Sequence, residues 1–456
     1  MGLHCEFTWI LHFESLFYAY QPIRIFGDLM STHPQELPSS PLLRPFYPAL
    51  DGLRAVAFLM VFLVHYGSGT IYIPYLSRLF DWGWVGVDLF FVLSGFLITG
   101  ILYDTLRSEH FFKNFYIRRV LRIFPLFYGV WIAALLLTPV LHIAWNRYNA
   151  ALAGYFGNLF YLGAYRHLHP NPGLLLLPPR HPGGEPRSIV VGAFWSLCVE
   201  EQFYLVWPAV VWLVRSRLVL LRISLGIIFV VLLLRLGYAH YHPDLVPLGA
   251  LYYGTPFRVD SLFVGAAIGL WLRGTSLPTL SIRRIAYATV ATVPAMFALG
   301  WIVTKPHNII SVSDTYVNTF GYTFIAVTAG ALIVLALDPL TYVARWLQQR
   351  VLVFLGRISY GMYALHAIPS GFLAQSYLHL IHYHVQYVIP PLALAGTVGA
   401  AWLSFRYLEA PFLRLKAVLA PQGLFQTRSV PDGQEMTVPE EAAPLQHQDY
   451  KLGPAA

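Results

Sequence analysis

Two ionisable side chains with different chemistry, Arg54 and His65, lie eleven residues apart in one apolar stretch, residues 50–67. If that stretch is helical, eleven residues make about three turns, so both side chains lie within about 20° of one face and roughly 16 Å apart along the axis. A histidine transfers protons near neutral pH, and an arginine binds anionic groups such as phosphates. In the alternative interpretation Arg54 snorkels to a membrane surface, and His65 at the helix end only caps the helix or contacts lipid headgroups. The spacing indicates a candidate base and a candidate anion-binding residue on one helix face.

A second group of basic residues, Arg118, Arg119 and Arg122, lies in FYIRRVLRIFPLFY (Phe115–Tyr128), directly before another apolar run. Arg118 and Arg122 are four residues apart, which places them on one face of a helix. Clustered guanidinium groups bind phosphate, bidentately where the geometry permits. The alternative is an anchor that sets orientation in a membrane, which composition alone favours.

Two adjacent carboxylates, Glu200 and Glu201, occur in FWSLCVEEQFYLVWP (Phe194–Pro208). They differ by about 100° around a helix, so at most one is expected to face a given site. One of them could orient or deprotonate a catalytic imidazole. In the alternative interpretation Ser196 caps the helix and the two carboxylates only favour its N-terminus.

Other polar residues in apolar stretches are expected to have supporting roles. A charge at membrane depth is costly, so Asp51 and Asp88 are expected to face the protein interior. Arg258 and Asp260 are predicted to form a structural ion pair, and His366 is expected to satisfy its hydrogen bonds between helices rather than to catalyse. The predicted supporting residues are Asp88, Arg258, Asp260, Ser359, Tyr360 and His366.

The composition is that of an integral membrane protein. Hydrophobic residues make up 57% of the 456 residues and charged residues 11%, whereas a soluble domain usually carries about 25% charged residues. The net charge of +8 does not indicate nucleic-acid binding, because the arginines lie in short loops between apolar runs. Cys5 and Cys198 exclude a disulfide framework. Neither they nor the scattered histidines form a metal-binding pattern, so we expect no metal site.

The elements that position these residues are predicted to be membrane helices, because apolar runs near 20 residues recur along the chain. We predict an all-α polytopic protein with about ten transmembrane helices around an internal cavity. Gly95, Gly265 and Gly269 are expected where helices pack closely. Tyr155–Tyr165 is too short to span and is predicted to be a half-helix or re-entrant segment. The predicted spans are residues 50–67, 84–103, 122–141, 202–214, 220–239, 259–273, 285–303, 320–337, 358–377 and 389–406.

The predicted membrane domain is residues 46–415. Residues 1–45 are predicted to be an extension, either upstream of a start at Met30 or forming an interfacial helix. Residues 416–456 are predicted to be a disordered tail, because they are mostly polar. The connection His142–Ala193 is rich in Pro, Gly and His and is predicted to be irregular. Basic residues are denser in alternate loops, which predicts that both termini are cytoplasmic.

Taken together, these stretches resemble the membrane acyltransferase-3 family, over about residues 46–415. Each string alone is a weak signal, but all of them occur in the family's order. The matching strings are LDGLRAVAFLMVFLVHY, GWVGVDLFFVLSGFLIT, FYIRRVLRIFPLFY, FWSLCVEEQFYLVWP, RVDSLFVGAAIG, LGRISYGMYALH and YLEAPF.

The resemblance implies transfer of an acyl group, commonly acetyl, from cytoplasmic acyl-CoA to a hydroxyl of an extracytoplasmic or lipid-linked carbohydrate. It implies that His65 is catalytic, that Arg54 helps to hold the donor, and that Arg118, Arg119 and Arg122 bind the CoA phosphates. His65 would act as a general base or as a transient acyl carrier, with Glu200 or Glu201 orienting it. The implied partners are acyl-CoA as co-substrate, a carbohydrate or glycolipid acceptor and membrane lipids, with no nucleic acid and no permanently bound cofactor.

Some members of the family carry a fused extracytoplasmic esterase-like domain. None is expected in this chain, which would then transfer directly or use a separate transferase partner. The implied location is the plasma (inner) membrane. A rival interpretation from another class is a glycolipid transporter or flippase whose pathway is lined by the same polar residues. A signalling or sensor protein is a weaker alternative, because no output domain is recognisable.

Overall fold

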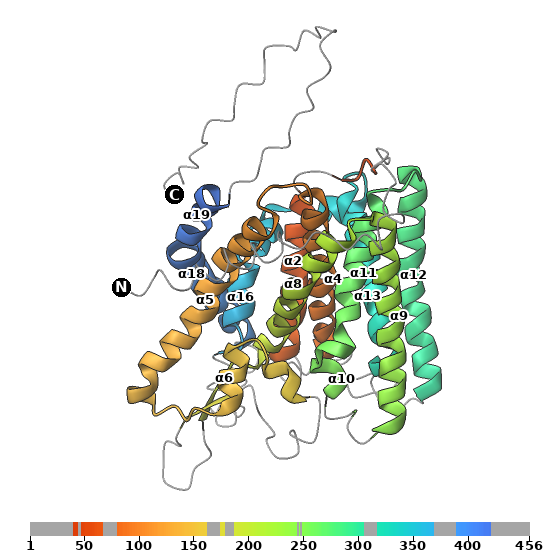
Figure 1. Ribbon diagram of the computed structural model, residues 1–456. Helices are drawn as coiled ribbons and strands as arrows, with labels where there is room; N and C mark the ends of the chain where they lie inside the picture. Colours follow the sequence, from red (N-terminus) through yellow and green to blue (C-terminus); the bar gives the residue numbers. More distant parts are fainter. Residues whose placement is uncertain are drawn as a thin grey trace, which may run out of the picture.

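The computed structural model describes residues 40–43, 47–66, 80–161, 174–177, 187–243, 246, 249–304, 317–368 and 389–420. This part of the chain is mostly helical, as predicted (Figure 1). Six of its helices are long and apolar enough to cross a membrane, which supports a multi-pass membrane protein. Written with the helical turns that extend them, they are α2 (Pro48–Tyr66), η2 with α4 (Trp82–Trp84, Val85–Asp104), α5 (Phe111–Leu141), η4 with α8 (Gly192–Phe194, Trp195–Val214), α9 (Arg217–Tyr241) and η6 with α13 (Val317–Gly321, Tyr322–Leu337).

The remaining helices include those at the other four predicted spans. Over the described residues α11, α12, α16 and α18 are too short or not apolar enough to count as spanning helices, and residues 369–377 of the ninth predicted span lie outside the described residues. These helices are α6 (Arg147–Ala153), η3 (Gly157–Tyr161), α10 (Ala250–Tyr253), α11 (Thr255–Leu272), α12 (Thr279–Thr304), α14 (Tyr342–Leu347), α15 (Arg350–Arg357), α16 (Ser359–Leu365), α18 (Ile389–Ser404), η9 (Phe405–Glu409) and α19 (Ala410–Leu419).

The connection that we predicted to be irregular contains short ordered elements. Besides α6 and η3 it holds a two-stranded antiparallel ribbon, β1 (Leu174–Leu177) paired with β2 (Arg187–Val190), with Leu174 opposite Val190. The all-α prediction therefore missed one small ribbon. The predicted half-helix at 155–165 is a single 3₁₀ segment, η3, as far as residue 161, and residues 162–165 lie outside the described residues.

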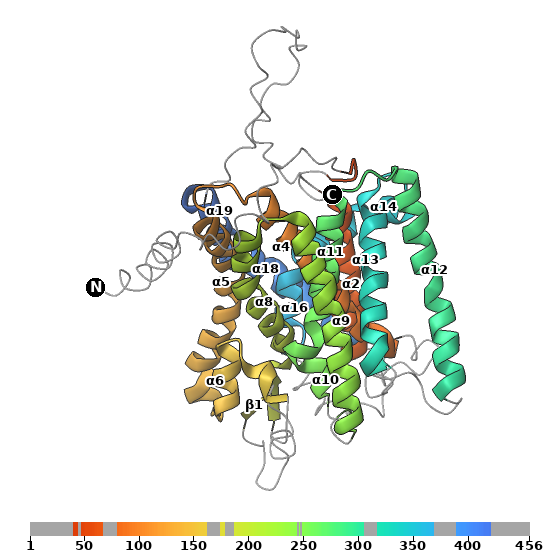
Figure 2. The same ribbon diagram turned by 45° about the vertical axis from the view of Figure 1, so that its right-hand side comes forward.

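Helices α2 and α4 form the centre of the bundle. Figure 1 shows α9 and α12 on one side of them and α5, α18 and α19 on the other, and Figure 2 shows α5 and α12 at opposite sides of the bundle. Most residues of α4 are buried, whereas α5 and α9 expose large apolar side chains such as Leu136 (73% exposed) and Phe229 (60% exposed). In a membrane, apolar side chains on the outer faces of spanning helices contact lipid, so these faces need no cover from other parts of the protein.

Close contact between α4 and α11 depends on glycine. A Cβ atom on Gly95 would overlap the carbonyl oxygen of Leu262, and one on Gly265 would overlap the carbonyl oxygen of Val92. Both glycines were predicted as close-packing positions, and the structure confirms them. Without a side chain the two helix backbones approach closely, which is how membrane helices gain packing energy.

We expect Gly265→Ala to lower the free energy of unfolding by about 1–3 kcal/mol, because the added methyl group forces α11 away from α4. The matched control is Gly226→Ala on α9, where nothing lies within 4 Å of the added Cβ. That change should be neutral or slightly stabilising, because alanine favours helix over glycine. Denaturant titration of both variants in detergent checks this, and equal midpoints would contradict it.

Candidate active site

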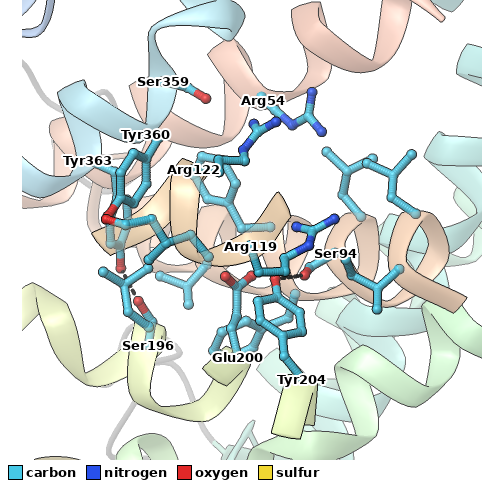
Figure 3. Close-up of a pocket in the computed structure, with 18 of the residues that line it drawn as sticks. Arg54, Ser94, Arg119, Arg122, Ser196, Glu200, Tyr204, Ser359, Tyr360 and Tyr363 are labelled. Atoms are coloured by element: carbon cyan, nitrogen blue, oxygen red, sulfur yellow. Dashed lines mark hydrogen bonds between the residues drawn. The ribbon is translucent and has the colours of Figure 1, made fainter. Parts of the chain in front are cut away.

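A cavity of about 260 Å³ lies between α2, α4, α5, α8 and α16. Its walls combine apolar side chains of α4, such as Phe90 and Leu97, with charged and hydroxyl groups from the other helices. Figure 3 shows these polar side chains pointing toward one another from several elements. An apolar cleft with a few convergent polar groups is the usual form of a small-molecule site.

Three arginines line this cavity: Arg54 from α2, and Arg119 and Arg122 from α5. Arg54 pairs with Asp51 one turn earlier, with 2.5 Å between Nη1 and Oδ1. Arg119 lies over the Tyr204 ring, 5.3 Å from its centroid. The structure therefore brings together three of the four arginines that the sequence predicted to bind the donor. Three cations with one carboxylate partner make this wall suitable for an anion.

Arg118, the fourth arginine of that prediction, does not line the cavity. Its Nε and Nη2 donate to the carbonyl oxygen of Ala420, at 3.0 and 2.6 Å. Arg118 and Arg122 therefore do not share one face of α5 closely enough to line the same cavity. The guanidinium of Arg118 instead contacts the end of α19.

Glu200 lines the cavity on the α8 wall, and Glu201 does not. The hydroxyls of Ser94 and Tyr204 hydrogen-bond to each other beside Glu200 (Figure 3). Glu201 lies on another face of α8, and its buried Oε1 has no hydrogen-bond partner among the described residues. The expectation that only one of the two carboxylates faces a given site is confirmed for this cavity.

Ser196 does not cap α8, contrary to the alternative considered from the sequence. The helix begins at Trp195, and its N-cap residue makes no side-chain hydrogen bond. Instead the Ser196 hydroxyl donates to the carbonyl oxygen of Ala193 (3.1 Å) and lies 2.6 Å from the Tyr363 hydroxyl. Ser196 and Tyr363 thus form the wall between α8 and α16.

Ser359 and Tyr360, two of the predicted supporting residues, also line the cavity from α16. The Tyr360 hydroxyl donates to the carbonyl oxygen of Ile123 on α5, at 2.7 Å. This bond ties α16 to the turn of α5 that follows Arg122.

His65 and His366 lie beside the cavity rather than on its wall. Their rings are in edge contact, with 5.0 Å between centroids. The His366 ring lies 5.6 Å from the ring of Tyr363, which does line the cavity. The described contacts of His65 are with His366 and with the carbonyl oxygen of Val61, so the predicted pairing of His65 with Glu200 or Glu201 remains a prediction.

His366 differs from its expected supporting role. Its Nδ1 lies 2.7 Å from the carbonyl oxygen of Tyr363, but its buried Nε2 has no partner among the described residues. The tyrosine at position 66 donates to the His366 carbonyl oxygen at 2.6 Å. His366 is therefore only half satisfied.

The predicted ion pair between Arg258 and Asp260 is wrong. Arg258 pairs with Asp88 at 2.9 Å, and Asp260 pairs with Arg235 at 2.7 Å. Residues two apart on a helix point in different directions, so each can only pair with another helix. These pairs, fully buried, connect α11 to α4 and to α9. They belong to the core and do not line the cavity.

Sequence reasoning missed Ser94, Tyr204 and Tyr363. A signal existed for Tyr204, which follows Glu200 by four residues and therefore shares its helix face. Ser94 and Tyr363 reach the cavity through contacts between helices, which no spacing within one segment reveals. In the part of the chain that the structure describes, no group of three His, Cys, Asp or Glu residues could hold a metal ion.

Comparison with known proteins gives a consistent result. A model of an acyltransferase domain family matches residues 47–407. The chain is 28% identical, over 81% of its length and 56% of the relative, to the peptidoglycan O-acetyltransferase OatA of Listeria monocytogenes. It is also 28% identical, over 80% of its length and 55% of the relative, to YrhL of Bacillus subtilis, whose name assigns the same activity provisionally. The chain thus spans little more than half the length of these curated relatives. No solved structure matches it.

Proposed function

Because this chain belongs to the acyltransferase-3 family, whose model covers residues 47–407, we propose that it transfers an acyl group, in the simplest case acetyl, from acyl-CoA to a carbohydrate hydroxyl. The donor would be cytoplasmic, and the acceptor an extracytoplasmic or lipid-linked carbohydrate. Relatives named as peptidoglycan O-acetyltransferases support a cell-wall glycan as acceptor. The observation that carries the proposal is the cavity in which Arg54, Arg119 and Arg122 face Glu200.

Acyl-CoA would bind with its thioester arm in the cavity and its nucleotide end outside. A volume of about 260 Å³ suits an acyl group with part of the pantetheine arm, but it is too small for the whole donor. The cationic residues that line the cavity are Arg54, Arg119 and Arg122. Guanidinium groups bind phosphate oxygens well, so we expect these residues to hold a phosphate group of the donor. We propose that Glu200 contacts the polar pantetheine arm of the donor. The hydroxyls of Ser94 and Tyr204, which hydrogen-bond to each other beside Glu200, would offer further polar contacts to that arm.

His65 would act as the general base. Its Nε2 takes the proton of the acceptor hydroxyl while the hydroxyl oxygen attacks the thioester carbonyl. The new C–O bond forms and the C–S bond breaks. The CoA thiolate then takes from Nε2 the proton that came from the acceptor hydroxyl. The rings of Tyr363 and His366 lie between the cavity and His65, so these rings would have to move aside for the thioester to reach His65 from the cavity.

The test is acyl transfer by the purified protein in proteoliposomes. Acetyl-CoA labelled in the acetyl group is supplied on one side, and a peptidoglycan or lipid-linked glycan fragment on the other. We expect label in the glycan and free CoA on the donor side. Movement of the glycan across the membrane without label would contradict the proposal and favour a transporter.

We expect Glu200→Gln to lower the transfer rate by about 10²-fold and Glu201→Gln to change it only a few-fold. The two changes are chemically identical and adjacent, but only Glu200 lines the cavity, where a group positioned on the reacting partners is worth such factors. Initial rates at saturating acetyl-CoA check this. Equal losses in both variants would show that the cavity wall is not what matters.

A further inference from the structure

The last described helix, α19, packs against the first turns of α5 at one end of the bundle (Figures 1 and 2). Two hydrogen bonds from the Arg118 guanidinium to the Ala420 carbonyl oxygen hold the end of α19 there, at 3.0 and 2.6 Å. A cation is favourable at this place, because the last carbonyl groups of a helix are the negative end of its dipole. Arg118 therefore fixes α19 beside Arg119 and Arg122.

This docking brings Lys416 of α19 close to the arginines of α5. Burial, together with the charges of Arg122, Arg119 and Arg118, lowers the pKa of Lys416 to about 7. None of these four basic residues takes part in an ion pair among the described residues. A cluster of like charges in which no member is directly paired with a carboxylate is electrostatically costly, and a bound polyanion relieves that cost.

Carboxylates on other elements attract the arginines of this cluster without forming ion pairs with them. Glu200 and Glu201 of α8 act on Arg119, and Glu409 of η9 acts on Arg122. In η9, which precedes α19, the carboxylate of Glu409 accepts a hydrogen bond from Ser404 at 3.0 Å and makes no ion pair with Lys416. Arg414, also on α19, is exposed.

We propose that Lys416 is a further donor-binding residue, which holds a phosphate group of acyl-CoA between α19 and α5. The proposal rests on the proposed function, because it names a second contact for the same donor. Arg119 and Arg122 line the cavity whereas Arg118 and Lys416 do not. Lys416 therefore lies where the nucleotide end of the donor would remain outside. Lys416 would then supply the phosphate contact that the sequence predicts for Arg118.

Binding of the donor should then depend on pH in a defined direction. Free Lys416 loses its proton as the pH rises through about 7, and a bound phosphate favours the charged form. Above pH 7 binding must therefore take up a proton, so the Kd for acetyl-CoA rises by up to about tenfold per pH unit. Below pH 7 Lys416 is already charged, and this contribution is flat.

The experiment measures the Kd of acetyl-CoA for the full chain in nanodiscs of neutral lipid. The pH is varied from about 6.5 to about 8.5, because the phosphates of the donor are ionised over this range. Lys416→Gln should raise the Kd about tenfold at pH 7, the size expected for one charge-assisted hydrogen bond, and should flatten the pH dependence. Lys416→Arg should restore the affinity and stay flat, because an arginine keeps its charge throughout. Arg414→Gln is the matched control on the same helix and should leave the Kd unchanged.

Each other outcome overturns the proposal. An unchanged Kd in Lys416→Gln excludes contact with the donor, and an equal effect of Arg414→Gln means a general surface charge. A parallel series uses nanodiscs that contain an anionic lipid. If Lys416→Gln weakens binding of that lipid and leaves the Kd of acetyl-CoA unchanged, the phosphate belongs to lipid headgroups. If the wild-type protein binds acetyl-CoA but transfers no label, the proposed function is contradicted. The Kd series would still decide whether Lys416 contacts the donor.

Discussion

Replacing His65 by alanine is expected to lower the rate of acyl transfer by about 10³-fold, with the Kd for acetyl-CoA close to that of the wild type. Its Nδ1 lies 2.7 Å from the carbonyl oxygen of Val61. A carbonyl oxygen can only accept, so this bond requires the proton on Nδ1 and leaves the lone pair on Nε2. Residue 65 is exposed, so we expect an acceptor hydroxyl to reach Nε2. Loss of a positioned general base costs factors of this order.

Two further variants make the result specific. His65→Asn keeps a donor for the Val61 carbonyl oxygen but carries no base, so it should be as inactive as His65→Ala. His240→Ala removes an exposed histidine at the end of α9 and should keep full activity. Label transfer from acetyl-CoA and a separate measurement of donor binding distinguish the two effects. If His65→Ala retained more than about a tenth of the activity, the base would have to be another group.

The sequence predicted the helices well where an apolar run is continuous and less well where charges interrupt it. The first two spans, predicted at 50–67 and 84–103, correspond to Pro48–Tyr66 and Trp82–Asp104. By contrast, α5 begins at Phe111 rather than at 122, because its arginines look like a loop in the sequence. Long basic side chains can extend to polar surroundings while the helix continues through them.

The candidate site was predictable only in those parts that depend on one helix. Helical spacing separated Glu200 from Glu201, and residue type selected Arg54, Arg119 and Arg122 as anion-binding groups. The partner of each buried charge depends on which helices pack together, so the pairing of Asp88 with Arg258 could not be derived from spacing. The same reason hid the approach of α19 to α5, since residues more than 290 positions apart meet there, as Arg118 and Ala420 do.

Breaking the buried pair of Asp88 and Arg258 should destabilise the fold strongly. Both side chains are fully buried, and Asp88 Oδ1 accepts from Arg258 at 2.9 Å and from Ser261 at 3.0 Å. The guanidinium of Arg258 also lies 4.1 Å from the ring centroid of Tyr322. We expect Asp88→Ala to lower the free energy of unfolding by about 3–5 kcal/mol, because it leaves an arginine charge buried without its partner.

The matched control is Asp104→Ala, which breaks the more exposed pair of Asp104 (43% exposed) and Arg273. Since water screens such a pair, this change should cost only about 1 kcal/mol or less. The double variant Asp88→Leu with Arg258→Met removes both buried charges and should recover most of the lost stability, because much of the cost is the unpaired charge rather than the lost attraction. Unfolding by denaturant in mixed micelles measures all three. If Asp88→Ala and Asp104→Ala had equal effects, the pair of Asp88 and Arg258 could not be what holds α11 against α4, and close packing through Gly95 and Gly265 would be the stronger contribution.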